Sequence, residues 1–286
     1  MSLFGFALVL AAAFCHATWN FFVKRINAGP ELVWLFSAVT VVVYLPVAIV
    51  AVVIERPAFD TMQIVFILGS AVLHLAYFLL LQRGYRYGDL SLIYPTARAT
   101  GPLLSSSFAV VFLGEMLTPQ IAIGAIAIIG GVLFLTRKQG SEVQHPLVSL
   151  AFGLATGCLI GTYTVWDAYA VSALMVPPLI QDYASSVLRS VVLAPLAARR
   201  TTQIRALWRD HRGGVLIIAL FNPLAYILVL YALTFTPVVF VAPTREISVL
   251  ITVVLGSLLL GEGALKHRLV WAVVILIGVS LLATAR

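Results

Sequence analysis

Charged residues are scarce in this sequence of 286 residues. Asp, Glu, Lys and Arg together make up 10% of it, whereas 62% of the residues are hydrophobic, and the mean hydropathy is +1.06. So few polar side chains cannot cover the surface of a water-soluble protein of this length. The sequence therefore excludes a soluble globular domain and predicts an integral membrane protein.

Cysteine and catalytic motifs are also lacking. The two cysteines, Cys15 and Cys158, lie in apolar stretches, where a free thiol behaves as a small apolar side chain. Their number and spacing exclude a disulfide framework and a metal site. The sequence contains no HExxH, GxSxG or paired-carboxylate signature, which weighs against a membrane-embedded enzyme. We predict no cofactor, no metal and no catalytic residue.

Long apolar runs are what the sequence has instead. Each run is about 18 to 23 residues long, enough to cross a hydrocarbon core of about 30 Å as a helix. The first run is too long for a cleaved signal peptide, so we expect a retained helix. The pattern predicts ten helices, at roughly 3–23, 32–53, 63–82, 90–113, 119–136, 147–168, 178–198, 214–233, 238–260 and 269–285.

Acidic residues are fewer than basic ones, 11 against 18, and the net charge is +7. The basic residues of the loops gather in the odd-numbered connections between helices, which hold thirteen of them, whereas the even-numbered connections and the two ends hold only Arg56 and Arg286. This is the positive-inside pattern of membrane proteins. We therefore predict a cytoplasmic side for the odd connections, including a basic loop at 199–212, and an outside location for both termini. The charge reports topology, and nucleic acid is excluded as a partner.

The sequence repeats itself at an offset of 147 residues. Ile93 to Glu115 reads IYPTARATGPLLSSSFAVVFLGE and returns as FVAPTREISVLITVVLGSLLLGE, ending at Glu262. The offset places Arg98 on Arg245, and Trp19-Asn20 on Trp166-Asp167. Similarity at a fixed offset indicates an internal repeat.

Five helices per repeat is an odd number, so the second repeat enters the membrane from the opposite side. We predict a first repeat at 1–138, a cytoplasmic linker at 139–146 and a second repeat at 147–286. Inverted repeats of this kind are the basis of alternating access in many secondary transporters, which bind substrate near the midplane where the repeats meet. The predicted fold is thus an all-α integral membrane protein, with ten transmembrane helices in two inverted five-helix repeats around a central cavity.

These residues resemble a known family. The Trp-Asn and Trp-Asp pairs, the prolines and arginines of the fourth and ninth helices, and the paired Leu-Gly-Glu endings are similar to the EamA family of the drug/metabolite transporter superfamily. The resemblance covers nearly the whole chain. It implies a basket in which helices one to four and six to nine surround the cavity, with helices five and ten behind. Within the family the sequence is similar to YddG-like exporters of amino acids and related metabolites.

Three arginines lie inside predicted helices: Arg98, Arg189 and Arg245. A charge in the hydrocarbon core costs about 2.5–3.5 kcal/mol on insertion scales, so such residues face the protein interior and have a partner or a function. A guanidinium is suited to binding the carboxylate of an amino acid or organic acid, which makes all three candidate substrate ligands.

A purely structural role is the alternative for each arginine. Arg189 would pair with Asp182 or Glu246, and the other two arginines would bind carbonyls freed by Pro95 and Pro243, which are also our candidates for helix breaking and gating. Arg245 and Glu246 are neighbours that point about 100° apart on a helix, which predicts that they do not pair as a simple helix-face bridge.

Aromatic and titratable residues complete the predicted site. The candidates for substrate binding are Tyr94, Trp19, Trp166, Tyr163, Tyr77, His74 and Asn222, and the candidates for proton coupling are Glu246, Asp167 and His16. Aromatic rings give a cavity apolar walls with polar handles. The alternatives are interfacial anchoring for the two tryptophans and a packing role for the histidines.

The functional prediction is a secondary transporter in the bacterial inner membrane. It exports small polar metabolites, foremost amino acids including aromatic ones, by alternating access. Its partners are this substrate and the lipid bilayer, and a monomer is compatible with the sequence. The alternatives are a flippase for lipid-linked substrates or a multidrug exporter of the same fold, and, with less support, a membrane-embedded enzyme.

Overall fold

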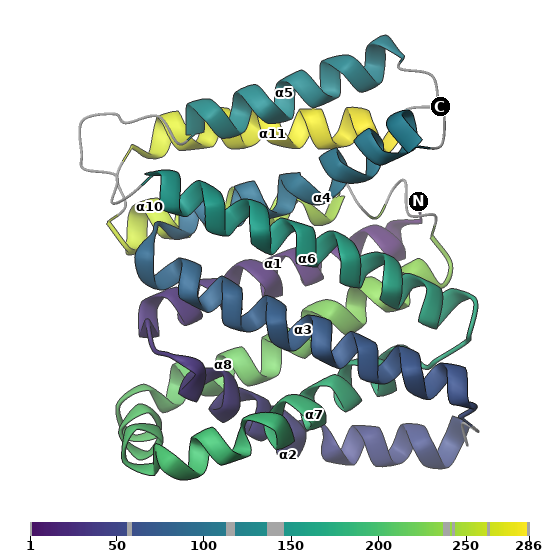
Figure 1. Ribbon diagram of the computed structural model, residues 1–286, viewed down its shortest axis with the longest axis vertical. Coiled ribbons are helices and arrows are strands. Elements are labelled where there is room, and N and C mark those ends of the chain that lie inside the picture. Colours follow the sequence, from purple (N-terminus) through teal and green to yellow (C-terminus); the bar gives the residue numbers. More distant parts are fainter. Residues whose placement is uncertain are drawn as a thin grey trace.

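The computed structural model describes residues 2–55, 59–112, 118–135, 146–236, 241, 244–261 and 264–284. These residues form ten helices (Figure 1), namely α1 (Leu3–Ile26), α2 (Pro30–Glu55), α3 (Thr61–Tyr87), α4 (Leu90–Phe112), α5 (Pro119–Leu135), α6 (Pro146–Ser172), α7 (Pro178–Arg199), α8 (Thr201–Leu233), α10 (Ile247–Leu259) and α11 (Leu265–Thr284). The all-α fold is confirmed.

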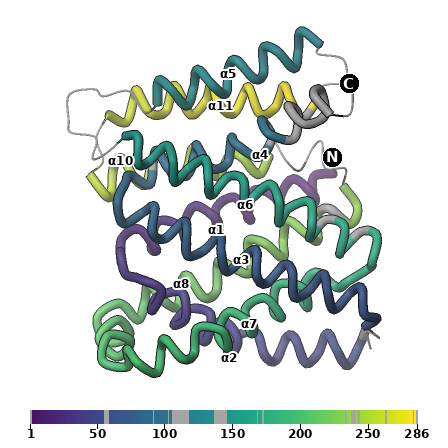
Figure 2. Tube along the Cα trace, in the orientation of Figure 1, coloured from purple at the N-terminus to yellow at the C-terminus, as the bar shows by residue number. Residues whose placement is uncertain are grey.

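The chain passes back and forth between two ends of the molecule. The α1–α2, α3–α4 and α7–α8 connections lie at the left in Figure 1, and the α2–α3 and α6–α7 connections lie at the right. The trace in Figure 2 shows the same course. Equivalent helices run in opposite directions, because α1 runs from right to left and α6 from left to right. This is the arrangement predicted for inverted repeats.

The helix contacts show the same relation. If α1 is exchanged with α6, α2 with α7, α3 with α8, and α4 with α10, then the α1–α8 contact becomes α6–α3. The α4–α6 contact likewise becomes α10–α1, and α2–α8 becomes α7–α3. The pairs α2–α7, α4–α10 and α5–α11 map onto themselves. Such self-mapped pairs lie on the axis that relates the halves, so a site built on α4 and α10 draws on both repeats.

α5 and α11 form the scaffold at one side of the molecule, as predicted (Figure 1). They cross closely, because a Cβ atom on Gly278 would lie 2.8 Å from the carbonyl oxygen of Gly124. Near the crossing, Ile128, Val132 and Ile275 form part of a small apolar core separate from the main one. In a bilayer the hydrophobic effect does not drive helices together as it does in water. Small residues at the crossing let the two backbones approach closely, so that van der Waals packing can hold them together.

Six of the described helices are long and apolar enough to cross a membrane: α1, α2, α3, α6, α8 and α11. Large apolar side chains such as Val42, Ile54 and Val165 are exposed on the outside, whereas Arg98, Asp167 and Glu246 are buried. An apolar exterior around a polar interior is the distribution that a lipid solvent favours. The protein is a multi-pass integral membrane protein.

Pro223 shows how these helices keep their backbone groups bonded. Proline lacks an N–H group, so the carbonyl of Ala219, four residues earlier, loses its helical partner. The hydroxyl of Thr40 on α2 donates to this carbonyl at 2.9 Å, and the hydroxyl of Tyr44 donates to the carbonyl of Leu220 at 2.7 Å. Both bonds join α2 of the first repeat to α8 of the second.

The segment 199–212 was predicted to be a basic loop, and this prediction is wrong because the segment is helical. α7 ends at Arg199, α8 begins at Thr201, and the helix is interrupted only at His211, with φ −131° and ψ 20°. Ile204 and Leu207 pack against the main core, although charged residues surround them in sequence. Helix formation is possible because the segment is amphipathic and lacks Gly and Pro until Gly213.

Two further predictions concern segments at the edges of the described residues. The ninth predicted helix, 238–260, is described as α10 only from Ile247, and Pro243 lies outside the described residues. The linker predicted at 139–146 also lies outside them, except for Pro146 at the start of α6. The repeat boundaries therefore stay predictions.

Candidate functional site

Arg98 and Arg245, the arginines at corresponding places in the two repeats, converge on one glutamate. Nε of Arg98 lies 3.3 Å from Oε2 of Glu246, and Nε of Arg245 lies 3.8 Å from Oε1 of the same side chain. The side chains of Arg98 and Glu246 are each 4% exposed. The Arg245 side chain is 14% exposed. Two guanidinium groups share one carboxylate, so this largely buried cluster carries one excess positive charge.

Arg245 and Glu246 do form an ion pair, although not as a bridge across one helix face. Glu246 lies in a turn directly before α10. Its carboxylate lies between Arg98 on α4 and its own neighbour Arg245. The alternative in which Arg98 and Arg245 bind freed carbonyls did not anticipate this shared carboxylate.

Several polar groups of this cluster have no hydrogen-bond partner in the described part of the chain. They are Nε and Nη2 of Arg98, Nε of Arg245 and Nε2 of His16, with Oε2 of Glu246 beside them. The arginine contacts with Glu246 are thus ion pairs without hydrogen-bond geometry. His16 is close enough to interact with the charges of both arginines, and its Nδ1 accepts a hydrogen bond from Trp19 at 3.3 Å. Buried donors without acceptors are costly, and an anionic ligand would satisfy them.

Tyrosines border the arginine cluster. The guanidinium of Arg98 lies 5.8 Å from the ring centre of Tyr94, whose hydroxyl lies 3.0 Å from Oγ of Ser248 on α10. Tyr77 and Tyr163 meet edge to face at 5.4 Å, and Tyr163 meets Tyr226 at 6.1 Å. All four tyrosines are buried, so the charged cluster adjoins a wall of aromatic rings with polar ends.

Asp167 is the centre of a second polar network that joins four helices. Its Oδ2 lies 2.9 Å from Nε2 of His74 on α3 and accepts a hydrogen bond of 2.6 Å from Tyr226 on α8. Its Oδ1 accepts a hydrogen bond of 3.0 Å from Gln181 on α7. The ring of Tyr163 covers His74 at 4.2 Å. Tyr163 and Tyr226 therefore belong both to this network and to the aromatic wall.

Arg189 lies elsewhere and has different partners. Its guanidinium donates to the hydroxyls of Ser37, Ser185 and Ser186 at 3.4, 3.3 and 2.8 Å, and it lies 4.5 Å from the ring centre of Phe78. The predicted ion pairs with Asp182 or Glu246 are wrong, because no acidic group of the described residues lies within ion-pair distance of Arg189. Its donors are occupied, which favours a packing role between α2, α3 and α7.

The two tryptophans have different surroundings. Trp19 is 1% exposed and lies 5.7 Å from the ring of Phe78, so it lies in the core. Trp166 instead stacks on Phe66 at 4.3 Å and donates a 2.7 Å hydrogen bond to the backbone carbonyl of Phe66. A Cβ atom on Gly69 would lie 2.4 Å from the Trp166 ring. Trp166 therefore joins α6 to α3 and is not part of the aromatic wall.

Two other predicted site residues are simple to place. Asn222 is buried on α8 beside Pro223. Pro95 lies in the second turn of α4, and the helix continues through it to Phe112. Within the described residues, no three His, Cys, Asp or Glu side chains lie together in a way that could hold a metal ion.

Comparison with known proteins identifies the chain. The model of the EamA-like transporter family matches residues 3–137 and again residues 147–284. The chain belongs to the EamA-like transporter family. The EamA model matches twice, once in each half, as a duplicated repeat requires. The protein is therefore a membrane transporter of the drug/metabolite transporter superfamily, and the family is not one of enzymes.

The EamA fold is also found among solved structures. One of them, described only as the crystal structure of a protein, is similar to this chain with a TM-score of 0.55 and 15% sequence identity, covering 99% of this chain and 96% of the other. At this identity the likeness concerns the fold alone. A search of curated proteins finds no match.

Two residues of the EamA site escaped the sequence analysis. Gln181 donates to Asp167, and Ser248 bonds to Tyr94. Gln181 carried a usable signal, because an amide inside an apolar helix must find a polar partner. Ser248 carried little, because a serine inside a membrane helix commonly bonds to its own backbone.

Proposed function

We propose that this EamA transporter exports small metabolites that carry a carboxylate, foremost amino acids including aromatic ones, across the bacterial inner membrane. In this respect it would resemble YddG-like exporters. The observation that carries the proposal is the convergence of Arg98 and Arg245 on Glu246. The two arginines come from corresponding places in the two repeats, on α4 and directly before α10. Transporters with inverted repeats bind substrate where their repeats meet.

The charge balance supports an anionic group on the substrate. Glu246 neutralises one of the two guanidinium groups, and a substrate carboxylate would neutralise the other. That carboxylate would also accept hydrogen bonds from the unpaired nitrogens of Arg98, Arg245 and His16. Charge-assisted hydrogen bonds of this kind are about twice as strong as neutral ones. A neutral or cationic drug would leave the excess charge unbalanced, so the multidrug alternative has less support.

The aromatic wall supports an apolar or aromatic side chain on the substrate. Tyr77, Tyr94 and Tyr163 are buried next to the arginines and offer ring surfaces for stacking. Their hydroxyls would hold polar parts of the substrate in place. The predicted central cavity would be the space between this wall and the arginine cluster.

The test is flux of a panel of labelled amino acids into proteoliposomes that contain the purified protein. Saturable flux of several amino acids is expected, with none in vesicles without protein. Absence of flux for every amino acid, from protein shown to be folded, would contradict the proposal and favour a flippase for lipid-linked substrates.

A pair of variants tests the role of Arg98. Arg98→Ala is expected to abolish flux while the protein still elutes as a folded monodisperse species. Arg268→Gln is the matched control, because Arg268 is also an arginine that is only 3% exposed, yet it lies away from the cluster, 2.8 Å from Asp89. It should retain flux in proportion to the folded protein. Equal losses of flux and of folded protein in Arg98→Ala would assign Arg98 a structural role.

We further propose that the Asp167 network couples export to protons. Among the three candidates, Glu246 is held by two arginines and His16 lies beside them. Asp167 instead faces the titratable imidazole of His74 at 2.9 Å, with Tyr226 and Gln181 completing its contacts. A proton could pass between carboxylate and imidazole without either group reaching the lipid.

The coupling proposal has a readout that a packing role would not change. Asp167→Asn keeps the size of the side chain and one acceptor oxygen but removes the charge, and its amide nitrogen cannot accept the hydrogen bonds made to the second carboxylate oxygen. It is expected to abolish acceleration of flux by an imposed pH gradient while leaving exchange of labelled for unlabelled amino acid. Loss of both activities together would contradict the coupling role. The cytoplasmic location of the basic α1–α2, α3–α4 and α7–α8 connections is part of the same proposal.

A further inference from the structure

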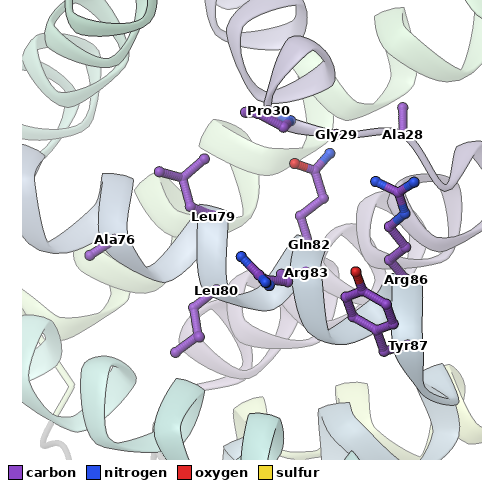
Figure 3. A pocket seen from close by; sticks show the side chains of 10 residues that line it. All are labelled: Ala28, Gly29, Pro30, Ala76, Leu79, Leu80, Gln82, Arg83, Arg86 and Tyr87. Carbon is purple, nitrogen blue, oxygen red and sulfur yellow. The ribbon is translucent and has the colours of Figure 1, made fainter.

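A pocket of about 560 Å³ lies at the end of α3, beside the turn between α1 and α2. Figure 3 shows its lining, which combines Gln82, Arg83, Arg86 and Tyr87 with the apolar side chains of Ala76, Leu79, Leu80 and Pro30. The pocket is lined by the first repeat only and contains none of the residues of the arginine cluster or the Asp167 network.

The polar part of the pocket is suited to an anion. Arg83 and Arg86 are exposed, and neither has an ion-pair partner among the described acidic residues. The amide nitrogen of Gln82 is buried and has no hydrogen-bond acceptor in the described part of the molecule. The residue as a whole is 6% exposed. Rotating this amide by half a turn would present its N–H groups to the pocket in place of its oxygen.

The start of α2 adds to the positive potential. Pro30 is the first residue of this 26-residue helix and lines the pocket together with Gly29. The N-terminal end of a helix carries a partial positive charge and unpaired N–H groups. The Glu31 carboxylate lies against Gly29 at this end of the helix, and its charge is balanced by an ion pair with Arg200. The opposing C-terminal end of α3 is occupied by Lys24, whose Nζ donates to the carbonyls of Tyr85 and Gly88 at 2.6 Å each.

The apolar part of the pocket indicates what the anion is attached to. Leu79 and Leu80 lie about one turn before the two arginines along α3, and Ala76 lies one further turn back. All three are partly exposed. Moving back along α3 from its end leads toward the middle of the membrane, so the pocket is cationic at the membrane surface and apolar below it. A soluble anion would contact only the cationic part of the pocket and would leave the apolar part empty.

We propose that this pocket binds the phosphate headgroup of an anionic phospholipid, with the start of an acyl chain against Leu79 and Leu80. Arg83, Arg86 and the amide of Gln82 contact the phosphate oxygens. Basic pockets between helices at a membrane surface recognise anionic lipid headgroups in this way. The lipid holds α3 to the α1–α2 turn, because it contacts Arg86 on one side and Gly29 on the other.

The test is titration of the detergent-purified protein with phosphatidylglycerol, counting bound lipids by native mass spectrometry. Arg83→Gln with Arg86→Gln should weaken the tightest phosphatidylglycerol site by roughly fivefold for each charge removed, about twenty-five-fold in total. Arg205→Gln with Arg212→Gln is the matched control, because it removes two charges near the start of α8, outside the pocket. It should leave the site unchanged, and Arg83→Lys with Arg86→Lys should restore most of the binding.

Two further probes separate a lipid from a free anion. Phosphatidylcholine should not occupy the site, and inorganic phosphate or glycerol 3-phosphate should raise the melting temperature much less than phosphatidylglycerol does. Equal stabilisation by inorganic phosphate would overturn the lipid assignment and make the pocket a soluble-anion site. Unchanged phosphatidylglycerol binding in Arg83→Gln with Arg86→Gln, in protein that remains monodisperse, would overturn the site itself.

Discussion

The sharing of Glu246 by two arginines predicts unequal effects of removing the members of the cluster. Glu246→Gln leaves the buried Arg98 and the partly exposed Arg245 with no carboxylate to balance either charge. Arg98→Gln leaves one arginine with one glutamate, because Arg245 still lies 3.8 Å from Glu246. We therefore expect the loss of the single acid to destabilise the protein much more than the loss of an arginine from the same ion pair.

The magnitudes follow from burial. Breaking a buried ion pair by removing one partner costs about 3–5 kcal/mol, because the remaining charge is uncompensated. This cost applies to Glu246→Gln, since the Glu246 and Arg98 side chains are each 4% exposed. For Arg98→Gln the remaining pair is balanced, so the cost is of the order of a lost polar contact, about 1 kcal/mol.

Thermal unfolding of the purified variants in detergent measures this difference. At about 2 °C per kcal/mol for a long chain, Glu246→Gln should lower the melting temperature by roughly 6–10 °C and Arg98→Gln by about 2 °C. Combining the two substitutions should recover part of the loss, because only one unbalanced guanidinium remains. Equal effects of the two single substitutions would refute the shared-carboxylate reasoning, and so would additivity in the double variant.

Other features of the fold give simpler predictions. Gly278→Leu should separate α5 from α11 and cost about 1–3 kcal/mol, measured as a lower melting temperature, whereas Gly130→Leu should be tolerated because no atom lies within 4 Å of its Cβ position. Thr40→Val should cost about 1–3 kcal/mol by leaving a carbonyl unpaired, and little in a Pro223→Ala background, where the helical N–H is restored. Arg205→Cys, in a variant without the native cysteines, should resist membrane-impermeant thiol reagents in intact cells; labelling would invert the proposed orientation.

The repeat was the most informative feature of the sequence. The offset of 147 residues identified Arg98 and Arg245 as equivalent. A repeat with an odd number of membrane-spanning helices requires that the second copy be inverted, so the overall arrangement was predictable from the number of helices. The role of Glu246 was not. Its contact with Arg245 depends on a turn just before α10, and periodicity alone cannot show where a helix inside an apolar run is interrupted.

The two Trp pairs show a second limit. Trp19 and Asn20 are both buried, whereas at the equivalent positions Asp167 is buried and Trp166 is partly exposed. The buried charge of Asp167 has the greater cost outside the protein, and Trp166 therefore turns to Phe66 on α3. The prediction of a basic loop at 199–212 failed for another reason. The charges indicated a loop, but exposed charges are also compatible with an amphipathic helix, and the first part of α8 packs Ile204 and Leu207 inward.

The two repeats differ most in their charge at equivalent positions. In the first repeat Asn20 accepts a hydrogen bond of 2.6 Å from Tyr85 on α3; in the second repeat Asp167, at the equivalent position, accepts one of 2.6 Å from Tyr226 on α8 and also faces His74. In each half a tyrosine on the third helix of the repeat donates to this position, although the offset of 147 places Tyr85 on Ala232 and not on Tyr226. Of the two acceptors, only Asp167 carries a charge. Glu246 is a second such difference, because Ala99 stands at its equivalent position in the first repeat. In the proposed coupling, the Asp167–His74 pair of the second repeat would carry the proton, while the arginine cluster, which draws on both halves, would hold substrate.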